Sequence, residues 1–459
     1  MKKMSPWLRL RLLELVDALL TEKRQPADRL FERVSAEHKL GSRDRRALSL
    51  RFYGFLRNYW KCVYLYAMYG TRGNRRKSMM DRIYAMEEEG PSAKELIDAL
   101  ELMGAHDASA YPVSSKVNMH PEIWRLFKAS FPDEQSAMAA ATYSPPTVDI
   151  RVNTFAGVTK SAVIQHLCAK GILVDELPYD GLRLGKRCAL ARDPLYQAGA
   201  FEVQDFASQV VARLCEAGPG MRVLDFCAGE GGKAIAMLND SQGKARVTLA
   251  DVNERRLERA RDRIGRIPGA CVEFARLQAE DVADVAELQA GEFAELQAGN
   301  VADMQPAKFA KLQPAKVAEL QAGTFVELQP GTFDLVVVDA PCSGMGTFRR
   351  NPDKTVHLRA SDVFEYAELQ RKILQRAAAF VKKGGRLVYI TCSYFKAENE
   401  DVVNDFVNAT PGAEFVDMRD VWRRTCSTAI PHGCTATGVR LEYTDGFFVA
   451  SLRMSTQTQ

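Results

Sequence analysis

The sequence predicts an α/β protein whose main part is a doubly wound, mainly parallel sheet, preceded by an all-helical domain and a small α+β module. Three observations predict this class. Apolar residues recur at helical spacings up to about residue 110, short alternating segments with Pro and Gly breaks follow, and strands then alternate with helices. We therefore expect three domains, at 1–112, 113–200 and 201–457.

The first domain, residues 1–112, is predicted to be helical and basic. Its segment "WLRLRLLELVDALL" places apolar side chains three and four residues apart. Residues 1–82 hold 20 Lys and Arg against 8 Asp and Glu, a local excess of +12 in a chain of net charge +4. Such an excess indicates a polyanionic partner, although a solvated helical surface explains the charge equally well.

The second domain, residues 113–200, is predicted to be small and mixed. The segments "TVDIRVNTF", "GILVDELPY" and "GLRLGK" have strand character, and the helix-like "SAVIQHLCAKG" lies between the first two. This combination indicates a compact α+β module.

The third domain, residues 201–457, alternates strands such as "MRVLDFCAG" and "FDLVVVDAP" with helices. Six tandem octads interrupt it at 286–333, each with Gln at the same position. Eight residues advance about 80° beyond whole turns of a helix, so no apolar face persists along them. We expect a duplicated surface loop, with a functional binding arm as the alternative.

The composition bounds the cellular setting. Hydrophobic residues make up 46% of the 459 residues and charged ones 26%, as in an ordinary soluble protein. The N-terminus lacks the apolar run of a signal peptide, and the segment 62–69 is too short to span a bilayer. We expect a cytoplasmic protein without a membrane partner.

The ten cysteines do not indicate a disulfide framework or a metal centre. No CxxC pair is present, and only Cys426, His432 and Cys434 approach the clustering that zinc requires. We expect no metal, and we expect most of the thiols to be buried as small hydrophobic groups.

A first candidate site is the glycine-rich turn in "VLDFCAGEGGKAIAM". A strand ends at Asp225, glycines then allow close approach of a ligand, and the next strand ends at Asp251, where a carboxylate can bind ribose hydroxyls. Dinucleotide dehydrogenases and adenosylmethionine-dependent methyltransferases share this pattern, and a turn needed only for packing is a further alternative. The candidate ligand-binding residues of the turn are Cys227, Ala228, Gly229, Glu230, Gly231, Gly232 and Lys233.

Two further segments each end an apolar run with a Cys-Ser pair. They are "DAPCSGMGTFRRNPD", which contains Asp339 and Cys342, and "YITCSYFKAENED", which contains Cys392. Ligands of open α/β sheets bind beyond the carboxyl ends of the strands, so these residues should share one crevice with Asp225 and Asp251. A thiolate in such a crevice is a nucleophile.

Together these three motifs closely resemble the RsmB/Nop/Sun family of RNA cytosine-C5 methyltransferases. "RVNT" at 151–154, "VQDFAS" at 203–208 and "DGFF" at 445–448 resemble it as well. "LGSRDRRALSLRFYGFLR" looks like the NusB-like RNA-binding domain of bacterial members. The resemblance implies a Rossmann-like methyltransferase domain, an RRM-like second module, and S-adenosyl-L-methionine as the cofactor.

The resemblance also implies roles for the site residues. Cys392 would add to C6 of cytosine, Cys342 would help to resolve the covalent adduct, and Asp339 would hold the cytosine edge or the methyl donor. The turn at 227–233 and Asp251 would cradle the donor, and a cation such as Lys233 would favour the thiolate. Candidate RNA contacts are Arg151, Asn153, Arg349 and Arg350, each with a structural role as the alternative.

The chain departs from the family pattern at three places. Glu230 stands where Pro is common in the turn, Arg276 stands where an adenine-binding aspartate is expected, and 355–357 lacks a Trp that often follows "NPD". These departures concern the adenine contacts rather than the reaction.

The expected substrate is small-subunit (16S) ribosomal RNA, because the NusB-like arrangement resembles the bacterial rRNA enzyme, and we expect a monomer. Transfer RNA is the alternative within the class. A DNA methyltransferase, which would use Cys342 as its nucleophile, and a non-catalytic ribosome-assembly factor are the alternatives outside it.

Overall fold

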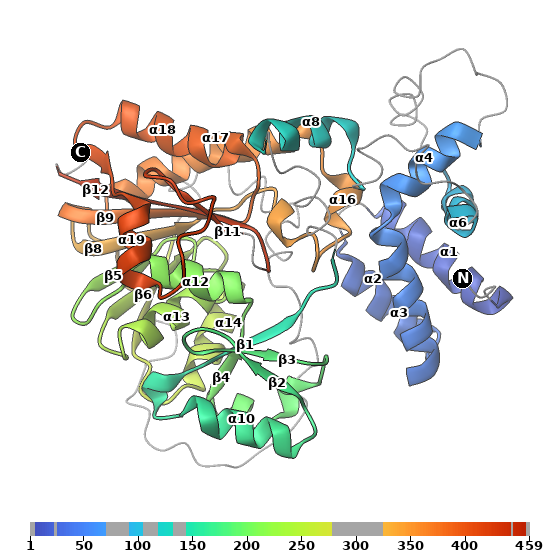
Figure 1. Cartoon of the computed structure of the whole chain (residues 1–459), viewed down its shortest axis with the longest axis horizontal. Helices are drawn as coiled ribbons and strands as arrows, with labels where there is room; N and C mark the ends of the chain where they lie inside the picture. The colour runs from blue at the N-terminus through green and yellow to red at the C-terminus, as the bar shows by residue number, and fades with distance from the viewer. Residues whose placement is uncertain are drawn as a thin grey trace.

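The computed structural model describes residues 5–22, 25–69, 91–103, 118–131, 144–277, 325–441 and 444–455. The predicted α/β class is confirmed: Figure 1 shows a helical part at one end and two sheets with their helices at the other. Most of the octad segment, residues 286–324, lies outside the described residues.

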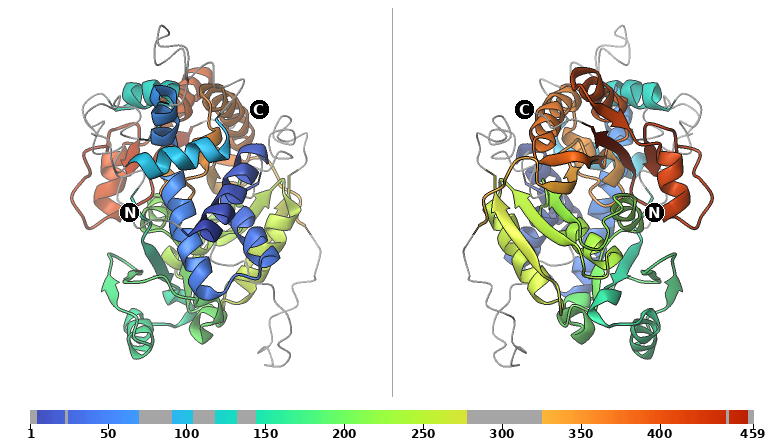
Figure 2. Two further views of the ribbon diagram at one scale, coloured as in Figure 1. Left: turned by 90° about the vertical axis from the view of Figure 1, so that its right-hand side faces the viewer. Right: turned by 90° about the vertical axis from the view of Figure 1, so that its left-hand side faces the viewer.

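The N-terminal helices enclose a core of their own. Leu12, Phe52 and Tyr64 are fully buried in it. Figure 2, left, shows these helices crossing one another in front of the sheets. The helices are α1 (Pro6–Thr21), α2 (Ala27–Glu37), α3 (Ser42–Leu56), α4 (Tyr59–Tyr69) and α6 (Ala93–Leu102).

A short helix, α8 (Pro121–Ser130), follows the helical domain and packs on the loops of the main sheet. Its Phe127 contacts the ring of Tyr394 edge-on at a centroid distance of 6.0 Å. Met345 and Phe348 belong to the same buried cluster. The helix therefore lies against both segments that carry the Cys-Ser pairs.

The small module is a four-stranded antiparallel sheet in the order β2-β3-β1-β4. Its fourth strand lies just past residue 200 and pairs with β1, Arg151 opposite Glu202. The elements are β1 (Val148–Val152), η3 (Thr154–Ala156), α10 (Lys160–Ala169), β2 (Val174–Glu176), β3 (Gly181–Leu184), η4 (Leu190–Arg192), α11 (Pro194–Gln197) and β4 (Phe201–Val203).

The main sheet has eight strands in the order β10-β12-β9-β8-β5-β6-β7, with β11 paired to β12. The neighbours from β9 to β7 are parallel, and β10, β11 and β12 are antiparallel additions. The strands are β5 (Arg222–Asp225), β6 (Arg246–Asp251), β7 (Val272–Arg276), β8 (Phe333–Asp339), β9 (Val381–Thr391), β10 (Ala413–Phe415), β11 (Val439–Leu441) and β12 (Phe447–Met454).

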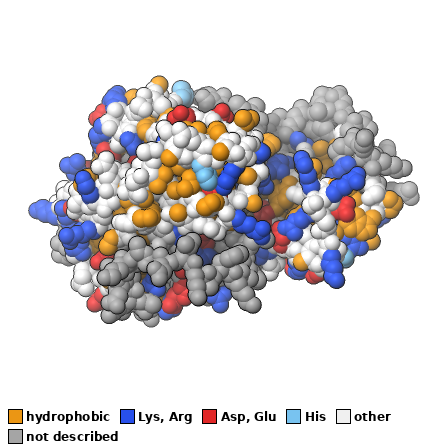
Figure 3. Space-filling view, turned by 90° about the horizontal axis from the view of Figure 1, so that it is seen from below, with side chains coloured by type: hydrophobic (Ala, Val, Ile, Leu, Met, Phe, Trp, Pro, Cys, Tyr) orange, Lys and Arg blue, Asp and Glu red, His pale blue; other side chains and the backbone are white. Residues whose placement is uncertain are grey.

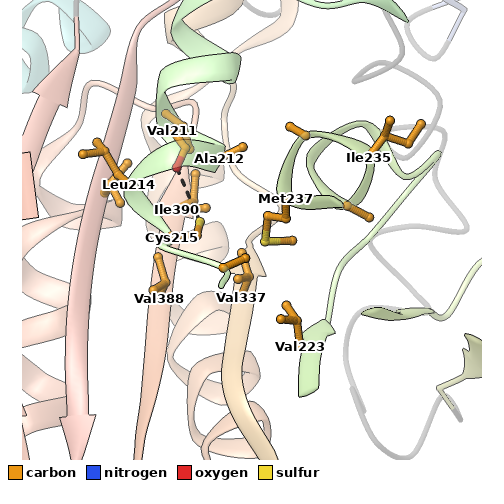
Figure 4. Close-up of a cluster of buried hydrophobic side chains, with 14 of the residues drawn as sticks. Val211, Ala212, Leu214, Cys215, Val223, Ile235, Met237, Val337, Val388 and Ile390 are labelled. Carbon is orange, nitrogen blue, oxygen red and sulfur yellow. Dashed lines mark hydrogen bonds between the residues drawn. The ribbon is translucent and has the colours of Figure 1, made fainter. Parts of the chain in front are cut away.

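Side chains alternate between the two faces of this sheet, as strand geometry requires. In β8, Leu335 and Val337 enter one apolar core, and Val336 and Val338 enter the other. Figure 4 shows part of the first core, where Val337 lies among side chains of neighbouring strands and of the covering helices. Burial on both faces explains why the strand reads as an unbroken apolar run.

Helices cover both faces of the sheet. The first face carries α12 (Phe206–Leu214), α13 (Gly232–Asp240), α14 (Glu254–Gly265) and α19 (Met418–Thr425). The second carries α17 (Ala360–Ala378) and α18 (Glu400–Ala409). Short helical turns η7 (Met345–Thr347), α16 (Lys354–His357) and η8 (Lys396–Glu398) lie in the loops after β8 and β9.

The surface is mixed in character. Figure 3 shows Lys and Arg side chains among acidic ones on the helical domain, and hydrophobic side chains over the centre of the same face, where the small module turns toward the viewer. Leu173 of that module is 78% exposed. Within the described ranges, the helices fall short of the length and apolarity needed to cross a bilayer.

Candidate active site

The predicted site residues gather at one edge of the main sheet. Strands β9, β8, β5 and β6 are adjacent and parallel, so their carboxyl ends lie together. Asp225 ends β5, Asp251 ends β6 and Asp339 ends β8, while Cys392 directly follows β9. Cys342 lies three residues beyond β8. Residues far apart in the sequence thus surround one crevice.

The two cysteines are in direct contact. Their sulfur atoms lie 3.4 Å apart, and the residues are only 6% and 7% exposed. The hydrogen bond from Cys342 lowers the pKa of Cys392, even though burial opposes ionisation. The same hydrogen bond, together with burial, raises the pKa of Cys342 well above its ordinary value. Either sulfur can donate in this contact, and the directions of the two pKa shifts correspond to donation by Cys342 to an ionised Cys392.

Two lysines lie near this pair. Lys233 is buried and forms an ion pair with Asp339, and its ammonium lies 5.1 Å from the ring centre of Phe447. Burial lowers the pKa of Lys233, but the attraction of Asp339 outweighs it and the net pKa is raised. Lys354 lies against Gly344 in the Cys342 turn and, after the hydrogen bond from Cys342, does more than Lys233 to lower the pKa of Cys392.

The glycine-rich turn approaches the end of β6 closely. The amide of Gly229 donates to Asp251 at 2.9 Å, and Gly231 has a φ of +75°. A Cβ atom at Gly231 would also meet Leu249 at 3.0 Å, so glycine is required there for both reasons. Burial raises the pKa of Cys227 in the same turn well above its usual value, so this thiol stays protonated.

The residues of this turn fit S-adenosylmethionine. Asp225 is 1% exposed, and neither of its carboxylate oxygens makes a hydrogen bond of ordinary geometry to the described residues. Burial, reinforced by repulsion from Asp339, raises the pKa of Asp225 to about 7. A buried carboxylate with free lone pairs suits a ligand that carries a cationic or donor group, and Asp251 at the next strand end can accept from ribose hydroxyls.

Two of the departures from the family pattern have local partners. Glu230 forms an ion pair with Arg259 at 2.6 Å, so its added negative charge is balanced. Arg276, at the position where an adenine-binding aspartate is expected, forms an ion pair with Glu254 at 3.0 Å. Arg276 offers no carboxylate, so an adenine contact at the end of β7 would have to come from a group other than an aspartate.

The four candidate RNA contacts are engaged within the protein. Arg151 is 4% exposed and donates to Asn153 at 3.1 Å, and Asn153 is fully buried. Arg349 donates to the carbonyl of Pro145 at 2.9 Å. Arg350 forms ion pairs with two aspartates, Asp205 and Asp445. Arg151 lies in β1 of the small sheet and Asn153 directly follows that strand, whereas Arg349 and Arg350 lie in the Cys342 loop.

Two residues close to the cysteines escaped the sequence reasoning. Lys354 follows "NPD", and Glu398 stands within the quoted segment "YITCSYFKAENED". Glu398 is fully buried between the two Cys-Ser turns. An acidic residue close to a catalytic motif is the only sequence signal for it, and the same signal marks many surface residues.

A cluster of metal-ligand type occurs elsewhere. Among the described residues it comprises Glu14, Glu37 and His38, on the helical domain and exposed to solvent in part. His38 already contacts Glu14 and Arg11, so the cluster is accounted for by ion pairing. Cys426, His432 and Cys434 do not form a comparable cluster in the described structure.

Family models match two parts of the chain. The model described as 16S rRNA methyltransferase RsmB/F matches residues 301–453, which include both Cys-Ser motifs. The model of the ubiE/COQ5 methyltransferase family matches residues 193–290, which include the glycine-rich turn. Both matches fall mostly in the domain that carries the crevice, and the second begins in the last segment of the small module.

Curated relatives extend the similarity. The ribosomal RNA small subunit methyltransferase B of Pseudomonas putida is 29% identical over 336 residues, 72% of this chain and 66% of the relative. That of Pseudomonas syringae pv. tomato is 27% identical over 371 residues, 79% and 73% of the two chains. The probable enzyme of this name in Bacillus subtilis is 28% identical and is covered to 60%. The matched stretch thus spans about two thirds of these relatives.

Solved structures share the fold. The crystal structure of PH0851 superposes with a TM-score of 0.68 at 20% identity, covering 98% of this chain and 100% of that one. NSun6 from Pyrococcus horikoshii with SFG superposes with a TM-score of 0.55 at 17% identity, covering 73% and 98%.

Proposed function

We propose that this chain, which is similar to the RsmB/F family of 16S rRNA methyltransferases and to the methyltransferase B relatives, transfers a methyl group from S-adenosylmethionine to C5 of a cytosine in small-subunit ribosomal RNA. The observation that carries the proposal is the contact between Cys392 and Cys342 at the rim of the donor site. An enzyme that methylates an oxygen or an exocyclic nitrogen has no use for two such thiols, whereas C5 of cytosine must first be activated by a nucleophile.

Cys392 acts as that nucleophile. Its thiolate adds to C6, a carbon–sulfur bond forms, and the electron pair of the C5–C6 double bond makes C5 nucleophilic. Bound S-adenosylmethionine supplies the electrophilic methyl group that C5 attacks. The direction of the pKa shift of Cys392, which is lowered first by the hydrogen bond with Cys342 and then by Lys354, supports this assignment over the reverse one.

Cys342 assists the release of product. Once Cys392 is bonded to C6 it carries no charge, and Cys342 is then the nearest sulfur to the bond that must break. A water molecule accepts the C5 proton, the C–H electron pair re-forms the C5–C6 double bond, and the carbon–sulfur bond breaks to expel Cys392 as thiolate. The hydrogen bond from Cys342 to that departing sulfur stabilises the developing negative charge.

The ion pair of Asp339 and Lys233 would help to hold both the cytosine base and the methyl donor. The carboxylate of Asp339 can accept from the exocyclic amine of cytosine, a pairing that carboxylates make with this base. Its ion pair with Lys233 fixes it at the end of β8. The donor would lie on the turn at 227–233, beside Asp225 and Asp251.

The test compares small-subunit rRNA from cells with and without the gene, by bisulfite sequencing and by mass spectrometry of nucleosides. We expect one 5-methylcytosine to disappear from the rRNA and to return when the wild-type gene, but not the Cys392→Ala variant, is restored. Loss of 5-methylcytosine from tRNA with rRNA unchanged would reassign the substrate, and unchanged RNA in both fractions would contradict the proposal.

A further inference from the structure

A buried glutamate that the proposed mechanism does not use lies between the two cysteine turns. Glu398 belongs to η8 and is 0% exposed. Its backbone carbonyl accepts the hydroxyl of Tyr389, a β9 residue, at 2.7 Å. The glutamate is therefore anchored to the sheet, and its carboxylate points into the protein instead of into solvent.

One side of the carboxylate holds the Cys342 turn. Ser343 donates to it twice, from the amide at 2.8 Å and from the hydroxyl at 2.5 Å. The amide nitrogen of Gln370 donates at 3.1 Å to Glu398 and at 2.8 Å to the carbonyl of Pro341. The residues on both sides of Cys342 are thus tied to Glu398, one directly and one through Gln370.

The same carboxylate holds the Cys392 turn. The hydroxyl of Ser393 donates to the oxygen that also accepts from the Ser343 hydroxyl, and the two hydroxyl oxygens lie 3.2 Å apart. Asn399 adds a second tie by donating to the carbonyl of Ser393 at 2.9 Å. Four donors converge on two carboxylate oxygens, which matches the acceptor capacity of an ionised carboxylate.

We propose that Glu398 is a positioning residue that clamps the two Cys-Ser turns together and thereby makes Cys392, rather than Cys342, the nucleophile. The proposal rests on the methyltransferase function proposed above. The sulfur contact requires both turns to keep their spacing, because each turn follows a different strand. Glu398 bonds to both turns, beside the contact of the two serine hydroxyls and the hydrogen bond from the Gly346 amide to the Cys392 carbonyl.

The charge of Glu398 favours the same assignment of the nucleophile as its hydrogen bonds to the two turns. The negative charge of Glu398 adds to the hydrogen bond with Cys392 and to burial in raising the pKa of Cys342. Cys342 consequently keeps its proton and remains the donor to Cys392. Removing the carboxylate leaves the spacing of the two turns less firmly fixed, and it also makes Cys342 easier to ionise. Both effects reduce the difference in pKa between Cys342 and Cys392.

The test uses the full-length protein without RNA or donor. Initial rates of iodoacetamide alkylation are measured at neutral pH for each cysteine by peptide mass spectrometry. We expect Cys392 to react faster in the wild type, and the Cys392-to-Cys342 rate ratio to fall about tenfold in Glu398→Gln, the equivalent of one pKa unit. Ser343→Ala and Ser393→Ala each remove one tie and should lower the ratio in the same direction.

Asp193→Asn is the matched control. Asp193 is also a buried carboxylate, 6% exposed, and it binds Lys170 at 2.6 Å in the small module. Its substitution should leave the rate ratio unchanged, so that a general loss of stability is separated from the loss of the clamp.

A wild-type ratio in folded Glu398→Gln would overturn the proposal. If that variant does not fold, the two serine variants decide, and wild-type ratios in both would overturn it equally. Failure of the proposed function gives a different result, since a wild-type protein that does not methylate RNA can still show the dependence of cysteine selectivity on Glu398.

Discussion

The amide of Ala27 donates a hydrogen bond to the carboxylate of Asp353 at 3.2 Å, although the two residues are 326 positions apart. Ala27 is the first residue of α2, whose N-terminal amides have no partner within the helix. Asp353 lies in the loop that begins with Cys342. Nearby, the indole of Trp60 donates to the carbonyl of Thr355 at 2.8 Å, and Val356 enters the helical core. The helical domain is thus attached to the same loop that carries Cys342.

Asp353→Ala should loosen this attachment. Loss of a buried helix cap costs about 1–2 kcal/mol, so amide hydrogen exchange should increase in α2 and in the 349–357 loop. The control is Asp417→Ala, which removes the N-cap of α19, a helix that covers the main sheet and is not a part of the helical domain. Equal exchange in α2 for wild type and Asp353→Ala would show that the hydrogen bond does not hold the domains together.

The cysteine variants should fail at different steps. Cys392→Ala should form no covalent RNA adduct and no product, because no thiolate remains to add to C6. Cys342→Ala should still add and transfer the methyl group but release slowly, so an RNA complex resistant to denaturing electrophoresis should accumulate when S-adenosylmethionine is supplied. Cys168→Ala, at an exposed thiol, is the control and should behave as wild type.

The opposite pattern has a clear meaning. A trapped complex in Cys392→Ala but not in Cys342→Ala would assign the nucleophile to Cys342, as in a DNA cytosine methyltransferase, and would contradict the pKa order of the pair.

The exposed arginines of α3 should contribute to RNA affinity. Arg43 and Arg46 lie on its exposed face in the basic N-terminal domain. If each contacts a phosphate, the double substitution to Glu should weaken binding and reduce the slope of log K against log salt by about 2. Arg419 and Arg423 on α19 serve as a matched control pair, since they are exposed but lie outside this domain. Equal slopes for wild type and the Arg43/Arg46 variant would argue against RNA contact here.

Asp225 should make stability depend on pH. Its pKa is about 7 in the folded protein and about 4 when unfolded. The unfolded chain therefore loses this proton first, and the wild type loses stability as pH rises from about 4 to about 7. Asp225→Asn removes that loss, so its unfolding free energy should rise relative to wild type across this window, by on the order of 2–4 kcal/mol.

Urea unfolding of both proteins between these pH values measures the difference. The control is Asp334→Asn: burial opposes ionisation of Asp334, but its hydrogen bonds with Lys382 and the Arg222 amide lower its pKa. This variant should be less stable than wild type by a constant amount above about pH 4, and the difference should close only at lower pH. If the unfolding free energies of wild type and Asp225→Asn change in parallel with pH, ionisation of Asp225 does not destabilise the folded protein.

The sequence by itself determined the fold class and the edge at which the site lies. The periods of the apolar pattern are local, so they predict helices and strands without knowledge of the partners. Parallel strands end at one edge, so Asp225, Asp251, Asp339 and the two cysteines could be assigned to one crevice from their positions alone. The motifs then restricted the chemistry of that crevice.

The tertiary structure alone decided what each side chain does there. Arg151 and Asn153 are buried in the small module and not in the crevice, Lys354 reaches the Cys342 turn, and Glu398 lies between turns that are about fifty residues apart in the sequence. The pKa order of the cysteines follows from a 3.4 Å contact across two strands. Such contacts join residues with no local spacing rule, and their electrostatics depend on burial, so no periodic pattern in the chain encodes them.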